Sequence, residues 1–587
     1  MDVWCAVINR VTANQGTFRT VEFSPTFNLV LAERTAEATE RDSRNGLGKS
    51  LLLEILNFCL GSRGTKGHGV AIEALENWEF RVDMTLADQS IAFSRAVSDR
   101  RWIYVDSSAE LPIQPEVEDA RTRFSVSDQR RALGRMMFGI TEEAEETQFG
   151  PSYRSLISYL LRRGRGGFLD PFTHDRNQQE GDKQVNVSYH LGLNWTDAAA
   201  FEELRTQKKT IDQLAKAVKA GSLPSYLGSE GALEAERVRL QEDADRRAEA
   251  LAQFEVREDY REIEGEANTL TEQVHRLVNE NIRDRRFIEL YSFRLAEEHE
   301  AVITGVEVEQ LFEEAQVELP EQVHRRMEEV KGFHDAVIEN RQKYLEEEVA
   351  QLEAAIAARE SDIESLDRRK TEFMNILNSA GALDEYTKRQ ELLVEVRGRL
   401  QDVESRLERL REVTQARTEW EERKARVVNQ AHVRYEELRS ERDKAIAFFN
   451  SNTEALYEAP GRLIIDVNDK GFKFDVKIDR SDSHGVSNMK IFCFDLMLMQ
   501  LWSHRSISPG TLVHDSALFD GVDERQIAAA LELAHSEAER LGFQYICTMN
   551  SDDLPRKELG EDSPVLQNIA IELHDDDPSG MLLGIEF

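Results

Sequence analysis

The stretch Asn45-Gly46-Leu47-Gly48-Lys49-Ser50 follows an apolar run at Phe27–Ala32 and leads into an apolar run of helical character that begins at Leu51. A strand, a glycine-containing loop and a helix in this order form the setting in which a loop binds phosphate groups. We therefore predict that this stretch holds the phosphates of a nucleotide, and we interpret the remaining sequence from this point outward.

The residue types in this loop suit a chain of phosphates. Gly46 and Gly48 let the backbone turn tightly and direct its N–H groups at an anion. Lys49 supplies a positive charge for the β- and γ-phosphates, and the Ser50 hydroxyl is a ligand for Mg²⁺. The helix that starts near Lys49 adds the attraction of its positive end. The predicted nucleotide-binding residues of the loop are Ser43, Asn45, Gly46, Leu47, Gly48, Lys49 and Ser50.

The loop departs from the full phosphate-loop pattern in two ways. The pattern has glycine where this chain has Ser43, and residues 33–44 make a longer connection than a minimal loop needs. A glycine-bearing helix cap that happens to precede Lys-Ser is the alternative interpretation. The extra residues are either a lid over the nucleotide or an inert surface insertion, and the sequence leaves both open.

Length and charge restrict the class of protein. A chain of 587 residues is too long for one compact core, so several structural units are expected. The net charge of −36 does not suit a protein that coats nucleic acid without specificity. Any contact with DNA therefore needs a local basic patch.

The cysteines and the apolar runs indicate a compartment. Cys5, Cys59, Cys493 and Cys547 are far apart and lie in apolar segments, so neither a zinc site nor a disulfide framework is predicted. This usage suits a reducing environment, and the expected location is the cytoplasm. Neither a signal peptide nor a membrane span is expected, since the sequence has no basic and then apolar leader and no apolar run of sufficient length.

Residues 1–195 are predicted to form the N-terminal half of an α/β head. Short apolar or alternating runs in residues 3–32 predict strands, and residues 78–105 predict a small antiparallel sheet. A helical pattern covers residues 152–163. The basic, glycine-rich segment 162–168 either lies near the nucleotide, where it contacts phosphates, or is a flexible linker.

Residues 196–456 are predicted to form a coiled-coil arm. The span is rich in residues that favour long helices, and its apolar residues recur at alternating steps of four and three. This is the heptad pattern of a coiled coil rather than the broader apolar face of a helical bundle. The arm is expected to reverse near residues 303–320, and a second break at 378–381 is a candidate elbow. The seam residues include Ala267, Leu270, Val274, Leu345, Ile356, Leu393, Val396, Leu400, Val403 and Leu407, with a polar step at Arg359.

Residues 457–587 are predicted to complete the head. A turn signal at Asn468-Asp469-Lys470-Gly471 separates two strands, and a helix is expected over residues 488–502. Residues 510–515 form a predicted buried strand that ends in the acid Asp515. The tail at residues 581–587 also has a strand-like pattern.

A phosphate loop, a central coiled coil and a late strand-end acid resemble the layout of the SMC, RecN and related ABC-type ATPases. In that family both chain ends form one α/β nucleotide-binding head, and an antiparallel coiled-coil arm is inserted between them. The resemblance implies ATP and Mg²⁺ as cofactors and a homodimer that sandwiches ATP between two heads. Asp515, after Thr511-Leu512-Val513-His514, matches the Walker B acid, which would hold Mg²⁺ together with Ser50. A helix cap or turn acid is the alternative role for Asp515.

Two positions near Asp515 depart from the family's pattern. The family's catalytic glutamate is replaced by Ser516, which cannot act as the same base, and Asp520, Asp523 and Glu524 are the nearby acids that would substitute for it. Asp523 also resembles the D-loop acid, one residue later than usual.

The signature and switch positions depart as well. Ser487 stands where the family's signature turn caps the γ-phosphate of the opposite subunit, but Asn488 and Met489 replace the glycines. Ser487 is equally suited to cap a helix without any nucleotide. Asn550 replaces the switch histidine, and its amide is able to hydrogen-bond a γ-phosphate but not to titrate.

These departures resemble a bacterial SMC-like subgroup with a C-terminal domain of unknown function, associated with three-component ABC-type anti-phage systems. The resemblance implies an ATP-gated head that dimerises and works with separately encoded effector proteins, and it does not imply fast turnover. The segment that carries it is His514-Asp515-Ser516 followed by Phe519-Asp520-Gly521-Val522-Asp523-Glu524-Arg525-Gln526.

Three functions compete at this stage. The first is an ATP-binding, slowly hydrolysing SMC-like motor or sensor. The second is a non-catalytic scaffold that binds nucleotide structurally, which Ser516 favours. The third is a RecN-like DNA-repair factor, which requires a basic patch in the head. The clustered candidates for that patch are Arg130, Arg131, Arg162, Arg163 and Arg165.

Overall fold

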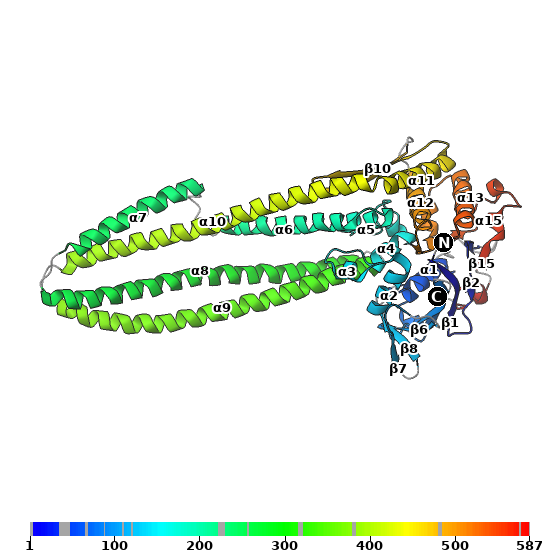
Figure 1. Ribbon diagram of the computed structural model, residues 1–587. Helices are drawn as coiled ribbons and strands as arrows, with labels where there is room; N and C mark the ends of the chain where they lie inside the picture. The colour runs from blue at the N-terminus through cyan, green and yellow to red at the C-terminus, as the bar shows by residue number, and fades with distance from the viewer. Residues whose placement is uncertain are drawn as a thin grey trace. The chain divides into compact units, whose positions relative to one another are not determined.

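The computed structural model of the chain contains two compact units. The head unit contains Met1–Leu204, Gln316–Val330 and Lys424–Phe587, and the helical unit contains Arg205–Ala315 and Lys331–Arg423. Figure 1 shows strands from both ends of the sequence within the head unit, so the predicted α/β class and the assembly of the head from both chain ends are confirmed. The described residues are 4–33, 47–64, 69–86, 89–107, 111–118, 121–220, 229–254, 258–314, 321–377, 383–478, 484–574 and 577–585.

A parallel sheet joins the two ends of the sequence in the head unit. Its strand order is β15-β3-β14-β13-β9, and every pair along it is parallel. β3 and β13 are buried along their whole length, as expected when both faces of a sheet are covered. Because the strands are parallel, their carboxyl ends lie at one edge of the sheet. The strands are β3 (Phe27–Ala32), β9 (Leu161–Arg162), β13 (Thr511–His514), β14 (Gln544–Asn550) and β15 (Ile569–Leu573).

The helix predicted at 152–163 is shorter than its pattern suggested. α4 spans Tyr153–Leu160, and the next two residues form β9, which pairs with Val513 and His514 of β13. Two residues are too few to show a strand period, so only the partner strand reveals this one. The pairing brings the end of β9 to the same sheet edge as Asp515.

A second sheet covers the other side of the phosphate-loop helix. α1 (Lys49–Cys59) contacts β3 and β14 of the parallel sheet and β4 and β5 of the second one. The helix is apolar on most of its surface, as expected for a helix packed on both sides. The second sheet, in the order β12-β1-β4-β5-β6-β8-β7 with β2 beside β1, contains β1 (Trp4–Ala13), β2 (Val21–Glu22), β4 (Glu79–Leu86), β5 (Gln89–Ala96), β6 (Trp102–Ser107), β7 (Glu116–Glu118), β8 (Arg121–Ser125) and β12 (Ile507–Ser508).

A long buried helix, α12 (His484–Trp502), runs through the head unit. It begins before the predicted start at residue 488, so Ser487 lies inside its first turn and is not its cap. Gly485 allows this start, because a Cβ there would lie 2.5 Å from the carbonyl oxygen of Gly521. The predicted hairpin turn is confirmed by β10 (Arg462–Asn468) and β11 (Gly471–Lys477). The other helices of the unit are α2 (Val126–Phe138), α3 (Glu142–Glu146), α5 (Glu180–Leu191), α11 (Arg439–Tyr457), α13 (Glu524–Leu541), α14 (Arg556–Leu559) and α15 (Pro564–Gln567).

A neutral histidine joins α5 to α12 in this core. The Nε1–H of Trp502 donates to Nδ1 of His190 at 2.9 Å, and Nε2 of His190 lies 3.1 Å from the carbonyl oxygen of Leu156. Since Nδ1 accepts, the ring proton sits on Nε2. Burial, together with the nearby charge of Arg505, lowers the pKa of His190 to about 3.

Long helices form the helical unit, as the heptad pattern predicted (Figure 1). α7 packs on α10 through an apolar cluster that includes Leu240 and Ala244 of α7 with Val396 and Leu400 of α10. Arg411, further along α10, bonds to Glu230 at the start of α7, so these two helices are antiparallel. The helices are α6 (Trp195–Ala220, which begins in the head unit), α7 (Glu230–Ala252), α8 (Glu258–Glu314), α9 (Glu321–Leu377) and α10 (Leu383–Glu437).

α8 and α9 form a second antiparallel pair. Arg359, the predicted polar step in the seam, bonds to Asp284 at 2.6 Å and to Asn281 at 2.8 Å. Asp284 is 2% exposed, so a buried charge pair replaces an apolar layer here. α8 remains helical through residues 303–314, while residues 315–320 and the predicted elbow at 378–381 lie outside the described residues. The predicted reversal point and arm limits therefore stay predictions.

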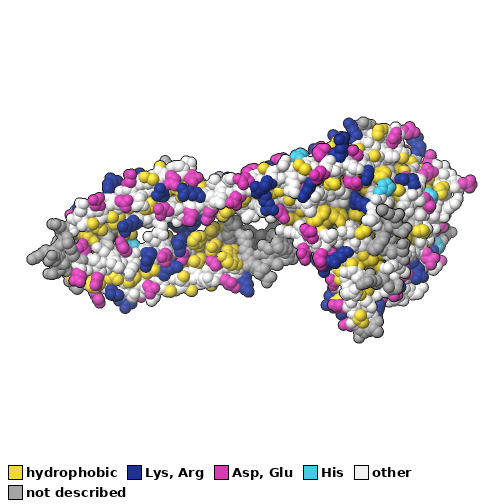
Figure 2. Space-filling view, in the orientation of Figure 1, with side chains coloured by type: hydrophobic (Ala, Val, Ile, Leu, Met, Phe, Trp, Pro, Cys, Tyr) yellow, Lys and Arg dark blue, Asp and Glu magenta, His cyan; other side chains and the backbone are white. Residues whose placement is uncertain are grey.

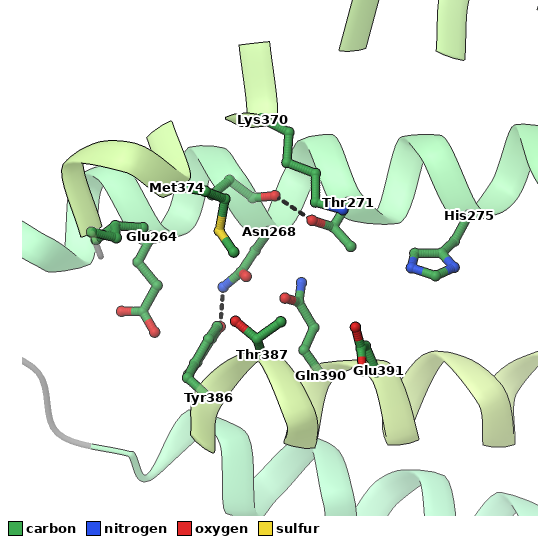
Figure 3. A pocket seen from close by; sticks show the side chains of 12 residues that line it. Glu264, Asn268, Thr271, His275, Lys370, Met374, Tyr386, Thr387, Gln390 and Glu391 are labelled. Carbon is green, nitrogen blue, oxygen red and sulfur yellow. Dashed lines mark hydrogen bonds between the residues drawn. The ribbon is translucent and has the colours of Figure 1, made fainter. Parts of the chain in front are cut away.

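Polar side chains from α8, α9 and α10 converge on a small pocket of about 40 Å³ (Figure 3). The amide of Asn268 on α8 donates to the Tyr386 hydroxyl on α10, and Thr271, His275 and Gln390 also line the pocket. This volume holds a few water molecules at most. A polar layer in a helical seam favours one register over others, and we assign it that role.

The Arg359–Asp284 pair generates a prediction about stability. Arg359→Met is expected to destabilise the α8–α9 pair by about 2–3 kcal/mol, because the buried Asp284 would keep only the exposed Arg283, at 3.2 Å, as a cationic partner. The readout is hydrogen exchange along α8 in the full chain. Arg285→Met is the matched control, since the neighbouring Arg285–Glu360 pair is exposed and should be worth less than about 1 kcal/mol. Equal exchange rates in the two variants would contradict the prediction.

His190 generates a prediction about pH. The folded protein leaves His190 neutral down to about pH 3, whereas the unfolded chain protonates it near pH 6.5. The free energy of unfolding should therefore fall as pH drops below 6.5, by about 1.4 kcal/mol from this group at pH 5.5. Asp175 acts in the opposite sense, because burial raises its pKa to about 6.

The variant His190→Gln isolates the histidine, since glutamine offers a donor and an acceptor but does not titrate. Thermal unfolding between about pH 7.5 and 5.5 should show a larger loss of stability for wild type than for His190→Gln. Parallel pH profiles for the two proteins would refute the assignment.

Candidate functional site

The carboxyl edge of the parallel sheet gathers the predicted site residues. The phosphate loop follows β3, Asp515 follows β13, Asn550 ends β14, and Gly164 comes just after β9. In an open α/β sheet this edge is where ligands bind. Of the phosphate-loop residues, Ser43, Asn45 and Gly46 lie outside the described residues.

The described half of the phosphate loop begins α1 in the geometry that an anion site needs. Gly48 has φ of +100° and accepts the first helical hydrogen bond from the N–H of Leu52 at 2.8 Å. A positive φ of this size is disfavoured for residues with a Cβ. Ser50 is exposed on the first turn, so its hydroxyl is open to a ligand at the sheet edge.

Lys49 and Asn550 meet across the edge, although they come from opposite ends of the sequence. Lys49 is 5% exposed, and its ammonium donates to Oδ1 of Asn550. The Nδ2 of Asn550 donates in turn to Asp553 at 2.6 Å. The amide is therefore held with its oxygen towards the lysine. The sequence singled out Lys49 and Asn550 but not Asp553, which no motif marks.

Asp515 is a buried carboxylate that accepts only from neutral donors in the described part of the chain. Its oxygens receive the N–H of Gly164 at 2.9 Å, the Ser516 hydroxyl at 3.1 Å and the Thr548 hydroxyl at 3.3 Å. It is 5% exposed. No cation among the described residues is bonded to this carboxylate, and carboxylate oxygen is the ligand type that Mg²⁺ prefers.

The other predicted acids lie away from this carboxylate. Asp520 is exposed, and its side chain lies 3.4 Å from Arg165. Asp523 caps α13, because its carboxylate accepts the N–H of Arg525 at 3.1 Å. Glu524 is exposed on the first turn of that helix. In the described part of the chain, these predicted residues share one side-chain hydrogen bond, from the Ser516 hydroxyl to Asp515.

Most of the arginines predicted to contact DNA serve the interior of the head unit. Arg130 is 3% exposed and donates to the carbonyl of Gly61, and Arg131 pairs with Glu145 at 2.9 Å. Arg162 is fully buried and Arg163 pairs with Glu54. On the face that Figure 2 shows, basic and acidic side chains are interspersed. The predicted basic patch is wrong for the buried Arg130, Arg162 and Arg163, whereas the side chains of Arg131 and Arg165 are 41% and 90% exposed.

The tail at 581–585 contacts the phosphate loop directly, which the sequence did not reveal. It forms turns and not the predicted strand, because the N–H of Leu582 donates to the carbonyl of Leu47 at 3.1 Å and not to a sheet neighbour. The carbonyl of Leu582 accepts the N–H of Arg19 at 2.9 Å. The side chain is fully buried against Gly48. The two remaining residues of the predicted strand, 586 and 587, lie outside the described residues.

Two negative findings limit the chemistry of the described residues. They contain no group of three or more His, Cys, Asp or Glu side chains placed to hold a metal ion by themselves. Nor does any of the described helices combine the length and the apolar character needed to cross a membrane.

Gly48 yields a prediction about the tail. In Gly48→Ala the new Cβ would lie 2.5 Å from Cβ of Leu582, and the backbone would keep an unfavourable φ of +100°. We expect a lower unfolding temperature, with about 1–2 kcal/mol lost from the backbone alone, and faster protease cleavage near residue 582. Gly16→Ala is the control, because a Cβ at Gly16 meets no atom within 4 Å. A tail equally protected in both variants would argue against the contact.

Comparison with known proteins yields one family match and several distant similarities. Residues 452–587 match the family described as an uncharacterised protein conserved in bacteria (DUF2326). Over 561 residues the chain is 20% identical to the uncharacterized protein YydD of Bacillus subtilis (strain 168), with 91% of each protein covered.

Two solved structures also align with nearly the whole chain. One is the Smc head domain with a coiled coil and joint from Pyrococcus yayanosii, at 14% identity over 97% of this chain and 95% of that chain, with a TM-score of 0.35. The other is the recombination mediator protein RecF-ATP in the RecFOR pathway, at 10% identity over 94% and 93%, with a TM-score of 0.30. Similarities at this level do not assign a function, so the function has to be inferred from the geometry of the sheet edge.

Proposed function

We propose that this chain is an ABC-type ATPase of slow turnover that binds Mg·ATP at the carboxyl edge of the parallel sheet. The observation that carries the proposal is the meeting of Lys49 and Asn550, with Asp515 on the next strand of the same sheet. A lysine at a helix N-terminus and a buried carboxylate at a neighbouring strand end are what a phosphate chain with Mg²⁺ requires.

The residues at the edge fit this ligand. The backbone of the phosphate loop and the ammonium of Lys49 would hold the phosphates, while the Ser50 hydroxyl and Asp515 would hold the metal ion. Bound Mg²⁺ would neutralise charge that develops on the phosphate oxygens. The fit rests on the open Ser50 hydroxyl and on the carboxylate of Asp515, which is bonded to neutral donors alone among the described residues.

Asn550 would act as the γ-phosphate sensor. The amide oxygen of Asn550 accepts a hydrogen bond from Lys49. If Lys49 moved to bind a γ-phosphate, this bond would break and the amide of Asn550 could hydrogen-bond the phosphate instead. Asp553 keeps the amide close to the edge during this exchange. The difference between the two sets of contacts is the free energy by which ATP would shift the head between two states.

Slow hydrolysis follows from the group next to Asp515. Ser516 donates its hydroxyl hydrogen to Asp515 and has no basic group with which to take a proton from water. Asp520 and Glu524 are exposed and separate from Asp515, so either would need a movement of its loop to reach an attacking water. Two heads would dimerise with Ser487 of one facing Lys49 and Ser50 of the other.

The biological setting that we propose is anti-phage defence. The resemblance of residues 514–526 to a subgroup of anti-phage systems suggests a defence role with separately encoded effectors, in which the helical unit passes on the state of the head. This part rests on that resemblance alone.

A nucleotide-gated scaffold without hydrolysis is the second candidate. The hydroxyl of Ser516 at the position of the catalytic glutamate favours it. In that case ATP would change the association of the heads and the helical unit would recruit an effector.

ATP turnover and molar mass, measured together, test the proposal. Wild type should bind ATP, hydrolyse it slowly and increase in mass by light scattering when ATP is added. Lys49→Ala should lose binding and Asp515→Ala should lose Mg²⁺-dependent hydrolysis, each by tenfold or more. Lys473→Ala removes an exposed lysine from β11 and is the control for Lys49→Ala, since both substitutions remove one positive charge. Its ATP binding and hydrolysis should match those of wild type.

The possible outcomes separate the candidates. Binding and ATP-dependent dimers without turnover would select the scaffold. Wild type that binds no ATP would overturn both candidates.

A further inference from the structure

Beneath the candidate site lies a cluster of charged and polar side chains that is completely removed from solvent. Arg162 of β9, Asp495 of α12 and His514 of β13 each have 0% exposure of their side chains. Tyr545 of β14 completes the cluster and is also fully buried. The four residues therefore connect three neighbouring strands of the parallel sheet to the long helix beside it.

Asp495 is the centre of this cluster. Nε of Arg162 lies 2.6 Å from one carboxylate oxygen, and the NH2 group of Arg162 donates to the other at 2.9 Å. Nε2 of His514 lies 3.2 Å from the first oxygen, and Nδ1 of His514 lies 3.0 Å from the Tyr545 hydroxyl. Since a carboxylate only accepts, Nε2 carries the proton and Nδ1 accepts from Tyr545. Burial lowers the pKa of His514, so the ring is neutral.

Arg162 also fixes the loop that follows β9. Its NH1 group donates to the carbonyl oxygens of Gly167 at 2.8 Å and Thr173 at 2.9 Å, and its NH2 group donates to that of Pro171 at 2.6 Å. This loop begins with Gly164, whose N–H donates to Asp515. One face of Asp515 is thus set by a loop that depends on Arg162.

The peptide that carries Asp515 is held by the same carboxylate. His514 directly precedes Asp515, and its ring is bonded to Asp495. Asp495 therefore restrains both the strand end that bears Asp515 and, through Arg162, the loop that contacts it. A displacement of Asp495 would therefore displace Asp515 both through His514 and through the loop that Arg162 holds.

α12 gives Asp495 a connection to the predicted signature position. Asn488 lies two turns before Asp495 on the same face of the helix, and its amide donates to the carbonyl of Asp520 at 3.1 Å. Ser487 is the neighbouring residue in the first turn. A contact made at the start of α12 would therefore be passed to Asp515 through the helix and Asp495.

Stability alone does not account for such a cluster. A buried ion pair loses so much hydration that apolar residues of similar volume are often as stabilising or more so. A buried network of ion pairs and hydrogen bonds does, however, hold its members in one arrangement. The cluster is better explained by the arrangement that it enforces than by the free energy that it adds.

We propose that Arg162, Asp495 and His514 are positioning residues that hold Asp515 and the N–H of Gly164 in place for the metal ion and couple them to the first turn of α12. This inference rests on the proposed function for the metal ion, but the placement of Gly164 is testable without any nucleotide. Partners that orient a metal ligand in this way commonly change metal affinity by about 10–100-fold when they are removed.

The test compares Asp495→Asn with Asp197→Asn in the full chain. Asp197 is also a buried carboxylate of the head unit paired with an arginine, Arg434 at 2.6 Å, but it belongs to α6 and has no bond to the cluster. Each substitution removes one buried charge and keeps the shape of the side chain. Arg434 is 32% exposed whereas Arg162 is fully buried, so Asp495→Asn should lose more stability, and Asp197→Asn controls for the loss of a buried carboxylate.

Hydrogen exchange without nucleotide is the first readout. Amides of residues 163–173 should exchange at least tenfold faster in Asp495→Asn than in wild type and should be unchanged in Asp197→Asn. Unchanged exchange in Asp495→Asn, or equal acceleration in both variants, would overturn the proposal.

Binding of a fluorescent ATP analogue, with Mg²⁺ and with a chelator, is the second readout. In Asp495→Asn the gain in affinity on adding Mg²⁺ should shrink about tenfold, while affinity in chelator stays within about twofold of wild type. Equal losses under both conditions would assign Asp495 a structural role only and overturn the proposal. Wild type that binds no analogue would refute the proposed function, and the exchange readout would still decide the placement of Gly164.

A second pair of variants covers the case in which Asp495→Asn does not fold. His514→Gln keeps a donor for Asp495, whereas His514→Leu removes it. The glutamine variant should retain the Mg²⁺ effect and the slow exchange of residues 163–173, and the leucine variant should lose both. Identical behaviour of the two would count against the proposal.

Discussion

The pairing of β3 with β14 is the interaction on which the rest of the head unit depends. Its hydrogen bonds run from the Phe27–Tyr545 pair to the Ala32–Asn550 pair and join two segments from opposite ends of the sequence. β14 in turn pairs with β13, so this register determines how far Lys49 lies from Asn550 and Asp515. A slip by one residue would turn the side chains of β14 to the opposite faces of the sheet and separate the lysine from its amide partner. The positions of the candidate site residues at the sheet edge therefore depend first on the pairing of the strand backbones.

The phosphate-loop helix is anchored at the end that faces away from the site. Arg95, Arg130 and Arg154 are buried, and each donates to a backbone carbonyl in or just after the last turn of α1. Cationic donors at a helix C-terminus satisfy carbonyls that lack helical partners and favour the negative end of the dipole. At the N-terminus of the same helix, the first N–H groups have no helical acceptor and remain available to an anion. Arg130, which the sequence suggested as part of a nucleic-acid surface, thus helps to stabilise the helix on which the candidate site is built.

The sequence predicted what local pattern encodes and missed what only distant contacts create. Lys49 and Asp515 were found because a glycine loop before a helix and an acid after an apolar strand are short, local signals. β9 was missed because two residues show no period, and the role of Leu582 was missed because a tail residue carries no sign of the loop it will cover. The heptads predicted the helices of the helical unit correctly. They did not show that α8 and α9 pair with each other while α7 pairs with α10, because every apolar seam is a suitable partner for any other.

The contact between Leu582 and Gly48 has a consequence for how the protein is made. On the ribosome the phosphate loop emerges early, but the strand and the tail that complete its surroundings emerge only after the long helices have been synthesised. Closing a loop of this length costs about 5 kcal/mol of chain entropy, which the antiparallel helices reduce by folding first. Until then β3 lacks both of its partner strands, β14 and β15, and the apolar surfaces of β3 and α1 are those from which a nascent chain would aggregate or engage a chaperone. A nucleotide that needs the completed sheet edge, as proposed above, could therefore not assist the folding of the first half of the chain.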